Sequence, residues 1–414
     1  MTPIFAVSRL PRNLVFGAGQ RAALPGYAAA MGRRALVVTD ERLVSDPQFL
    51  ELMQTLSSAR LETAIYSGTI AELPASSILD GLEMGKVLGA DLVIGIGGGS
   101  CLDAAKVIAL LLSHGGQPSD YYGEFKVPGP VLPLIAIPTT SGTGSEVTPV
   151  AVVSDPDRAV KVGIASPHLI PHTAICDPEL TYTCPPGLTA FSGADALTHA
   201  IEALTNLRRP VDAKTVHEHV FVGKNAFSDQ HALEAIRLIA GNLRAACKDG
   251  SDRMARDGLM MGSTLAGLAF GTAGTAAAHA VQYPVGALTH TPHGMGVAVM
   301  LPYVMEFNKG HAEAEMAEIA DAMNVGAGLD RAEKAAAAID AVTALFAAIG
   351  IPASLRDLGM SEDKLAWTAE AAMGATRLVK NNPRPLDLAS MSTLITAAFE
   401  GDRTALRRSA EDTR

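Results

Sequence analysis

Cysteine is scarce in this sequence, and its copies are widely spaced. Cys101, Cys176, Cys184 and Cys247 form no Cys-x-x-Cys pair in a chain of 414 residues. A disulfide framework or a thiolate zinc site would need clustered or regularly paired cysteines, so neither is indicated. We interpret the four cysteines as small apolar side chains of the protein interior.

Long apolar runs are also missing. No uninterrupted stretch reaches the roughly 18 residues that crossing a bilayer requires, and residues 1–16 are broken by Pro3, Arg9, Pro11 and Arg12. The beginning of the chain therefore lacks the continuous apolar segment of a signal peptide. We expect no membrane partner and take the cytoplasm as the default location.

A concentrated basic surface is the third absence. The formal net charge is −10, and Arg33-Arg34, Arg208-Arg209 and Arg407-Arg408 are isolated pairs. Proteins that bind nucleic acids gather Lys and Arg on one face, because the phosphates must be neutralised. We therefore expect no nucleic-acid partner.

The sequence does contain enough apolar material for two domains. Its hydrophobic fraction is 48%, and 414 residues exceed the usual length of a single core. Strand-like segments dominate up to Cys184-Pro185-Pro186, and helical patterns follow from there to the C-terminus. We predict an α/β domain with a parallel, Rossmann-like sheet over residues 1–185 and an all-helical domain over residues 186–414.

One apolar run, Ala35 to Thr39, ends in Asp40. Strands that are apolar on both faces belong to parallel sheets flanked by helices. A carboxylate after the second strand of a dinucleotide fold can accept the hydroxyls of the adenosine ribose and would repel a 2′-phosphate, so Asp40 favours NAD over NADP. The alternative is an N-cap for the following helix, and both roles can coexist.

A glycine turn follows the next strong strand. Residues 91–96 run into Gly97-Gly98-Gly99-Ser100, after which a helical pattern begins. Glycine lets backbone N–H groups approach a phosphate, which the helix dipole also favours, so this turn is predicted to bind an anion. The spacing differs from the Gly-x-Gly-x-x-Gly pattern of a standard Rossmann fold. A tight turn without a ligand is the alternative.

A hydroxyl-rich loop follows a third buried strand, residues 132–138. It reads Thr139-Thr140-Ser141-Gly142-Thr143-Gly144-Ser145-Glu146. At the carboxyl end of a parallel strand it would lie where such sheets bind ligands, although Ser, Thr and Gly also cluster in ordinary loops. Lys161, in a predicted hairpin with residues 150–155, could reach a cofactor phosphate or be a solvated strand residue.

In the helical half, Asp195 and His199 stand four residues apart in a small, apolar run. On a helix this spacing places both side chains on one face, as is common for metal ligands. Taken alone, such a pair is more often a surface or half-buried pair. His279, on a helix expected to end before Pro284, and His293, at a helix start marked by Pro and Gly, would each alone be a structural histidine.

Together these segments resemble the iron-containing (group III) alcohol dehydrogenase family along nearly the whole chain. The motifs that carry the resemblance are Gly97-Gly98-Gly99-Ser100 with Asp103 and Lys106, Pro138 to Glu146, Gly193 to His199, and Pro292-His293-Gly294. The resemblance implies a dinucleotide-binding domain followed by an all-helical metal-binding domain.

The resemblance also assigns the site residues. It implies that the metal ligands are Asp195, His199, His279 and His293. It implies that the glycine turn holds the pyrophosphate of NAD and Asp40 its adenosine ribose. The further cofactor contacts that we expect are Ser100, Asp103, Thr139, Thr140, Thr143 and Lys161.

The chemistry of this ligand set agrees with the resemblance. One carboxylate and three imidazoles suit a borderline divalent ion such as Fe²⁺, with Zn²⁺ as the alternative. Such an ion would act as a Lewis acid on the oxygen of an alcohol or aldehyde while a hydride passes to or from nicotinamide C4. We expect an NAD-dependent alcohol dehydrogenase or aldehyde reductase with a small alcohol or aldehyde as substrate, assembled as a homodimer or a higher homo-oligomer.

Two positions depart from the family. Many relatives carry a histidine four residues after the ligand that matches His279, near substrate and cofactor, and this chain has Tyr283 there. With an ordinary pKa of about 10, tyrosine is a poor base at pH 7, so we expect Tyr283 to line the substrate pocket rather than to relay protons. The segment Ile70-Ala71-Glu72-Leu73-Pro74 stands where relatives often have Pro-Asn-Pro.

Two alternative functions follow from related groups. Tyr283-Pro284-Val285-Gly286 and the insertion after residue 206 resemble the hydroxyacid–oxoacid transhydrogenase branch, which interconverts 4-hydroxybutyrate and succinic semialdehyde. A 4-hydroxybutyrate dehydrogenase or such a transhydrogenase is therefore one alternative. A lyase similar to dehydroquinate synthase shares the two-domain plan and is the alternative from another class. A binding protein without catalysis would be expected to lack ligands, and all four are present.

Overall fold

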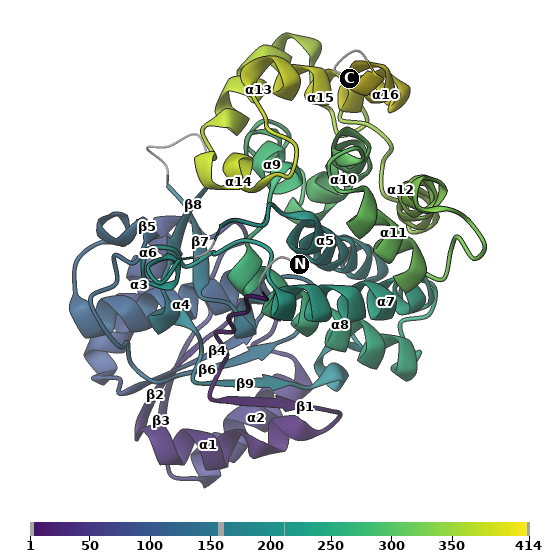
Figure 1. The fold of residues 1–414 in the computed structure, drawn as a ribbon. Helices are drawn as coiled ribbons and strands as arrows, with labels where there is room; N and C mark the ends of the chain where they lie inside the picture. Colours follow the sequence, from purple (N-terminus) through teal and green to yellow (C-terminus); the bar gives the residue numbers. More distant parts are fainter. Residues whose placement is uncertain (1–3, 156–160, 211, 412–414) are drawn as a thin grey trace. The chain divides into compact units, whose positions relative to one another are not determined.

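The computed structural model describes residues 4–155, 161–210 and 212–411 (Figure 1). This part of the chain divides into two compact units. The α/β unit consists of the described parts of Arg9–Cys184 and Ala213–Val220. The helical unit consists of the described parts of Met1–Ser8, Pro185–Asp212 and Phe221–Arg414.

Among the described residues, six parallel strands form the main sheet of the α/β unit, which confirms the predicted fold class. Their bounds are β1 Asn13–Phe16, β2 Arg34–Val38, β3 Glu62–Tyr66, β4 Leu92–Gly97, β6 Leu134–Pro138 and β9 Thr173–Cys176. They lie in the order β1-β9-β6-β4-β2-β3. The chain leaves β2 toward β3 on one side and leaves β4 toward β6 on the other. Parallel sheets bind ligands beyond the carboxyl ends of the strands at such a reversal, here between β2 and β4.

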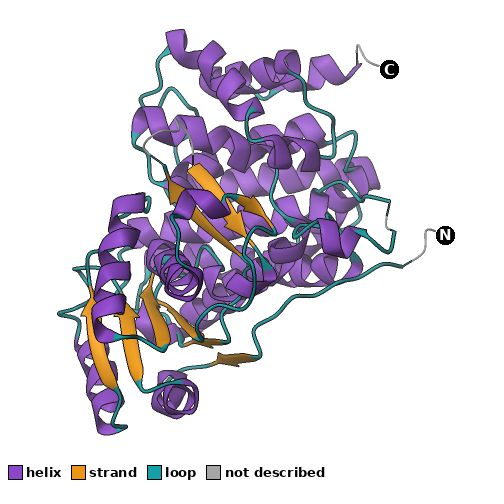
Figure 2. Cartoon of the chain, turned by 90° about the vertical axis from the view of Figure 1, so that its left-hand side faces the viewer, coloured by secondary structure: helices purple, strands orange, loops and turns teal. Residues whose placement is uncertain are grey.

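Helices cover both faces of this sheet (Figure 2). Val37 and Ile94 pack with α1 (Leu24–Met31) and α2 (Pro47–Ser58) on one face. Their neighbours Leu36 and Val93 point to the other face, where α3 and α4 lie. The bounds of these two helices are α3 Ala75–Leu88 and α4 Gly99–His114. Burial on both faces explains why the strands read as uninterrupted apolar runs.

A smaller sheet adjoins α4. The predicted hairpin is present as β7 (Val150–Ser154) and β8 (Lys161–Ala165), which pair antiparallel, and β5 (Gly123–Glu124) pairs with β8. Residues 156–160, between these two strands in the sequence, lie outside the described residues.

Lys106 of α4 holds this helix against the strand β7. Its side chain is fully buried, and Nζ donates to the carbonyls of Thr148 and Val150 at 3.0 and 2.7 Å. Asp103 Oδ1 lies 3.8 Å from Nζ. Burial lowers the pKa of Lys106 to about 8, although the carboxylates of Asp103 and Glu146 act to raise it.

We predict that Lys106→Met destabilises the protein and that the loss of stability grows with pH. Because the pKa of Lys106 is about 8 in the folded protein against an ordinary 10.5, the unfolded chain binds more protons between these values. The wild type therefore gains stability as the pH rises through this window, and a methionine variant does not. Urea unfolding of both proteins at pH 7 and pH 9.5 should show their difference widening by about 1–2 kcal/mol. If the difference in unfolding free energy between the two proteins were the same at both pH values, the lowered pKa of Lys106 would be contradicted.

The helical unit is built around α5 (Pro186–Thr205), whose residues 193–205 are all buried. This part of α5 lies in the interior of the unit, where the helix packs against α7, α8 and α10. The other helices are α6 Thr215–Glu218, which belongs to the α/β unit, α7 Ala226–Lys248, α8 Arg253–Ala273, α9 Ala277–Thr289, α10 His293–Asn308, α11 Glu313–Ala322, α12 Arg331–Ala348, α13 Leu365–Met373, α14 Thr376–Asn381, α15 Leu388–Glu400 and α16 Thr404–Glu411. Among the helices of the described residues, none combines the length and the apolar character that crossing a bilayer requires.

The prediction that the helix of His279 ends before Pro284 is wrong. Helix α9 continues to Thr289 and contains Pro284. Proline lacks the N–H that would bond to the carbonyl four residues earlier, and it usually breaks or kinks a helix. Here Pro284 and Val285 are both buried, so their tertiary packing offsets the missing hydrogen bond.

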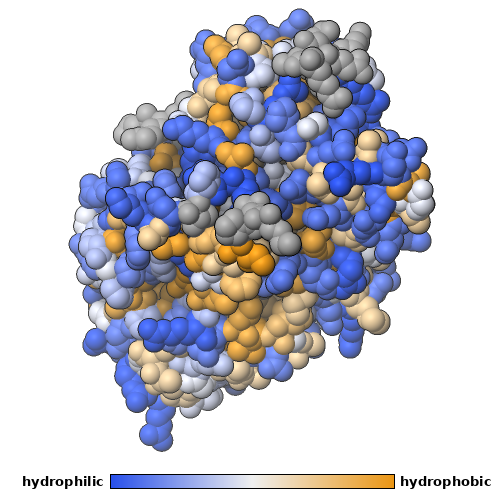
Figure 3. All heavy atoms as spheres, viewed as in Figure 1, coloured by the Kyte–Doolittle hydropathy of each residue, from blue (hydrophilic) through white to orange (hydrophobic). Residues whose placement is uncertain are grey.

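Some large apolar side chains remain at the surface. Ile4, Val87 and Met254 are strongly exposed, and Figure 3 shows apolar side chains among hydrophilic ones on the face that it draws. Folded proteins ordinarily expose single apolar residues. These residues alone define no interface, and the expected homo-oligomer stays a prediction.

Candidate metal centre and cofactor site

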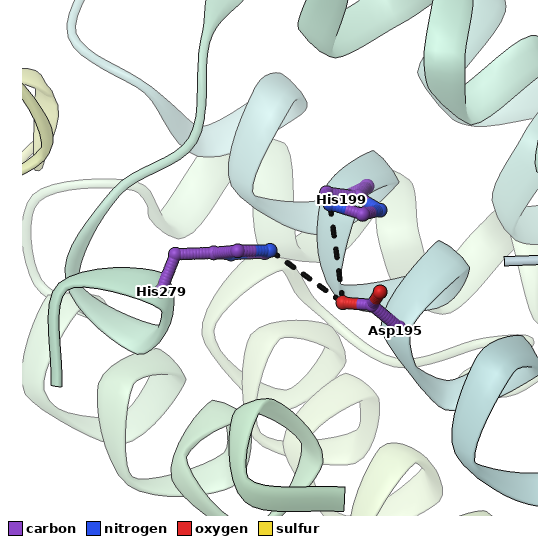
Figure 4. Close-up of side chains that lie close together, drawn as sticks. All are labelled: Asp195, His199 and His279. Carbon is purple, nitrogen blue, oxygen red and sulfur yellow. Dashed lines mark ion pairs between the residues drawn. The ribbon is translucent and has the colours of Figure 1, made fainter. Parts of the chain in front are cut away.

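Asp195 and His199 lie on one face of α5, as their spacing predicts (Figure 4). Both are buried, with 3% and 5% of their surface exposed. The Nε2 atom of His199 is 3.9 Å from Oδ1 of Asp195. The alternative of a surface pair is therefore excluded by their burial.

Helices α9 and α10 bring His279 and His293 to the same carboxylate. The Nε2 atoms of His279 and His293 lie 3.5 and 4.0 Å from Oδ1 of Asp195. Asp195, His199 and His279 each offer a ligand atom within 4.8 Å of the others'. His293 is the more open member, since 26% of its side chain is exposed. The sequence-predicted ligands therefore converge on one oxygen.

Gly294 explains how the start of α10 reaches α5. A Cβ atom at this position would lie 2.2 Å from the backbone carbonyl oxygen of Phe191 in α5. Only a residue without a side chain permits this approach of the two backbones. Since His293 precedes Gly294, the close contact delivers its imidazole to the cluster.

The residues present fit a small divalent cation. Oδ1 of Asp195 and Nε2 of His279 are buried and lack a hydrogen-bond partner among the described residues, which is uncommon for buried polar atoms. Ligand atoms around a tetrahedral zinc-like ion are about 3.4 Å apart, given metal–ligand distances of roughly 2.0–2.2 Å. The three separations between Nε2 atoms and Oδ1, 3.9, 3.5 and 4.0 Å, exceed this value by about 0.1–0.6 Å.

The electrostatics of the cluster also favour a cation. Burial alone would raise the pKa of Asp195, but His199 and the other imidazoles hold it well below its usual range. Burial would lower the pKa of His279, but Glu202 and Asp195 together raise it to about 9. The cluster thus attracts positive charge, and a bound divalent metal would replace the proton that the raised pKa keeps on His279.

Glu202 belongs to this site, and our sequence analysis did not identify it. Its carboxylate is buried in α5, and Oε2 lies 2.6 Å from Nδ1 of His279. The available signal was its position, seven residues after Asp195, because this spacing returns to the same face of the helix.

Tyr283 lies beside the cluster, one turn after His279 in α9. Its ring centroid is 6.3 Å from that of His293, and the planes are inclined by 26°. The side chain is partly exposed. This position suits a residue that lines a pocket next to the ligands.

In the α/β unit, the glycine turn and the hydroxyl-rich loop lie together. The N–H group of Thr139 donates to the carbonyl of Gly97 at 3.0 Å. Cβ atoms built on Gly98 and Gly99 would lie 3.6 Å from Thr140 and 2.6 Å from Thr143. The turn begins α4, whose N-cap residue Gly98 provides no side-chain hydrogen bond, and Ser100 stands in the first turn of α4. Backbone N–H groups at such a helix start are suited to an anion.

Asp40 follows β2, across the strand reversal from the glycine turn. Its carboxylate accepts hydrogen bonds from the backbone N–H and the guanidinium of Arg42, and Sγ of Cys101 lies 3.8 Å away. Burial would raise the pKa of Asp40, but Arg42 holds it below the usual value. The carboxylate does not cap α2, because Asp46 accepts from the first N–H groups of that helix.

A small, mainly apolar pocket lies near the same edge of the sheet. It is lined by Leu43, Asp46, Gln48, Phe49, Leu52, Ile96, Thr139 and Leu180. Thr139 connects the pocket to the loop that the sequence assigns to the cofactor.

Asp103 and Lys161 are engaged with other protein groups. The carboxylate of Asp103 accepts from the hydroxyl of Ser145 at 2.6 Å and from the N–H of Val152 at 2.9 Å. Nζ of Lys161 lies 2.5 Å from Oε2 of Glu72, a residue of the segment that departs from the family. The cofactor contacts of both residues stay predictions.

Comparisons with known proteins indicate the same family for both halves of the chain. The family described as "Iron-containing alcohol dehydrogenase" matches residues 11–178, and "Fe-containing alcohol dehydrogenase family, C-terminal" matches residues 189–399. The chain is 37% identical to "Long-chain-alcohol dehydrogenase 1" of Geobacillus thermodenitrificans over 373 residues, 89% of this chain and 90% of that protein.

Solved structures show the same fold. A crystal structure of 1,3-propanediol oxidoreductase superposes with a TM-score of 0.89 and 34% identity, covering 95% of this chain and all of that chain. Sulfoacetaldehyde reductase from Bifidobacterium kashiwanohense in complex with NAD⁺ gives a TM-score of 0.81 and 26% identity, covering 96% and 99% of the chains. With both halves matched, the chain belongs to the iron-containing alcohol dehydrogenase family and is an oxidoreductase.

Proposed function

We propose that the protein is an NAD-dependent alcohol dehydrogenase or aldehyde reductase that holds a divalent metal, Fe²⁺ or alternatively Zn²⁺. The observation that carries the proposal is the approach of three histidine Nε2 atoms to within 3.5–4.0 Å of one buried carboxylate oxygen. The ligands would be Asp195, His199, His279 and His293. When bound, the metal supplies Lewis-acid stabilisation of negative charge on the alcohol or carbonyl oxygen.

The protein groups around the ligands set the conditions for this chemistry. Phe270 stacks on His199 with ring centroids 4.2 Å apart and shields that imidazole from water. His293 and Tyr283, which are less buried, form the side of the cluster that a substrate can reach. The phenol of Tyr283 lines this side and shapes the space for the substrate.

The α/β unit would bind NAD at the strand reversal. The glycine turn and the start of α4 hold the pyrophosphate with backbone N–H groups. The carboxylate of Asp40 accepts the ribose hydroxyls, and the small apolar pocket with Leu43, Ile96 and Leu180 lies near this edge of the sheet. The NAD⁺ complex of a structurally similar reductase supports this choice of cofactor.

The substrate class is best identified by a turnover screen. Fe²⁺- and Zn²⁺-loaded protein is tested with short aldehydes and semialdehydes, and oxidation of NADH is followed. Net consumption of NADH supports the proposal, while phosphate release from a sugar phosphate without net change of cofactor would instead indicate a lyase similar to dehydroquinate synthase. Exchange between 4-hydroxybutyrate and an oxoacid, without added NADH, would indicate the transhydrogenase that Tyr283-Pro284-Val285-Gly286 resembles.

We predict that His279→Ala abolishes metal binding and turnover while the affinity for NADH stays within about twofold. Loss of this ligand leaves the buried carboxylate of Asp195 without its nearest nitrogen, and we expect affinity for Co²⁺ or Zn²⁺ to fall by roughly 100-fold or more. Titration calorimetry with the metal and fluorescence titration with NADH measure the two affinities. His311→Ala is the matched control, because His311 is an exposed histidine of the same unit. Full activity of a metal-free His279→Ala protein would refute the mechanism.

We predict that Asp40→Gly raises the use of NADPH relative to NADH by at least about tenfold. The change removes a negative charge from the expected place of the 2′-phosphate and releases the guanidinium of Arg42 from its carboxylate partner. The ratio of kcat/KM for the two cofactors is the measurement. Glu41→Gln, which removes an exposed carboxylate from the neighbouring position, should leave the ratio unchanged. An unaltered preference in Asp40→Gly would rule out the ribose contact.

We predict that Tyr283→Phe keeps kcat within about threefold of the wild type and leaves its pH profile unchanged. Lining a pocket needs the ring and not the hydroxyl, whereas loss of a proton relay costs 10²–10⁴-fold. Steady-state kinetics between pH 6 and pH 10 check this. Tyr283→Ala, which removes the ring, should raise KM, and a fall of 100-fold or more in kcat for Tyr283→Phe would establish a relay instead.

A further inference from the structure

Glu202 is a buried carboxylate whose two oxygens face three N–H donors. Oε1 accepts from the backbone N–H of Ala278 at 2.7 Å. Oε2 accepts from the backbone N–H of Ala276 at 2.9 Å and lies 2.6 Å from Nδ1 of His279. Only 2% of the residue is exposed. None of these partners is a lysine or an arginine, so the charge is balanced by backbone dipoles and the imidazole of His279.

These contacts make Glu202 the cap of α9. The N-cap residue of that helix is Ala276, which has no side chain able to accept a hydrogen bond. The first N–H groups of a helix need acceptors, and its positive dipole end favours a negative charge. A carboxylate from α5 supplies both, and it thereby fixes the start of α9 against α5.

The same carboxylate determines which nitrogen of His279 faces the ligands. When Nδ1 donates to Glu202, Nε2 is the atom left toward Asp195, and it lies 3.5 Å from Oδ1. Metal-binding histidines commonly donate their other N–H to a carboxylate in this way, which orients the ring and raises its basicity as a ligand. Asp195, His199 and Glu202 are thus three positions on one helix that converge on a single site.

We propose that Glu202 is a positioning residue of the metal centre, which caps α9 and holds His279 as an Nε2 ligand. The inference rests on the proposed function, since it assumes that the cluster binds a divalent metal. With neutral imidazoles, the charges of Asp195 and Glu202 balance those of a divalent ion. A buried group of zero net charge avoids the large cost of placing an uncompensated ion in the protein interior.

Metal affinity of the folded protein tests this role. Glu202→Gln keeps an oxygen for Nδ1–H but loses the charge and turns an amide N–H₂ toward Ala278. Glu202→Asp keeps the charge but is one methylene shorter. We expect both to bind Co²⁺ about 10–100-fold more weakly than the wild type, with an altered visible absorption spectrum of bound Co²⁺ and an unchanged affinity for NADH.

Glu306→Gln is the matched control. Glu306 is a buried carboxylate of the same unit with cationic partners, Lys309 and Arg407. It stands 13 residues after His293 in α10, which is about 20 Å along the helix. This variant should bind Co²⁺ within twofold of the wild type and with the same spectrum.

The outcomes separate a positioning role from a purely structural one. A cap alone would lower the melting temperature of Glu202→Gln, while the folded protein kept the affinity and the Co²⁺ spectrum of the wild type, and this result would overturn the inference. A wild type that binds no divalent metal would end the proposed function, whatever the variants show.

A second measurement tests the inference on the wild type, without any Glu202 variant. Nitrogen NMR of ¹⁵N-histidine-labelled, Zn²⁺-loaded wild type should show a proton on Nδ1 of His279, with the signal assigned by its loss in His279→Ala. Metal bound through Nδ1, or a proton absent from it, would refute the positioning role even if no Glu202 variant could be purified.

Discussion

The burial of the Asp195 carboxylate is the constraint on which the helical unit depends. A charged group away from water must have compensating partners, or the fold loses several kcal/mol. Here the partners come from three directions, with His199 on the same helix, His279 from α9 and His293 from α10. The helices pack so that these side chains converge, and the close approach at Gly294 serves the same end. The packing of the helices in this unit and the convergence of these side chains therefore depend on the same contacts.

In the α/β unit, the predicted anion site is formed by backbone N–H groups rather than by side chains. Strand order reverses between β2 and β4, and Gly99, the first residue of α4, leaves room for Thr143. A side chain at Gly99 would obstruct this packing, since its Cβ would lie 2.6 Å from Thr143. At the edge of this region, Asp40 forms an ion pair with Arg42.

The two departures from the family lie outside the motifs that carry the resemblance. The motif residues that carry the resemblance are retained, while Tyr283 replaces a histidine next to the ligands. Glu72, in a segment that departs from the family, forms an ion pair with Lys161. Both positions belong to the predicted surroundings of the substrate or the cofactor, and not to the predicted ligand set.

The sequence by itself determined the fold class and the glycine turn, because each depends on local spacing or residue type, whereas the predicted ligand set came from the resemblance to the family. Apolar runs ending in glycine indicate buried parallel strands. The spacing of four residues between Asp195 and His199 places both side chains on one face of a helix. The continuation of α9 through Pro284 and the contacts of Glu202 with the start of α9 were decided by tertiary structure. Proline ends a helix unless packing compensates for its missing hydrogen bond, and only the folded chain shows that packing. Glu202 reads as one more acidic residue in the sequence, because its partners in α9 lie more than seventy positions away and only folding brings them together.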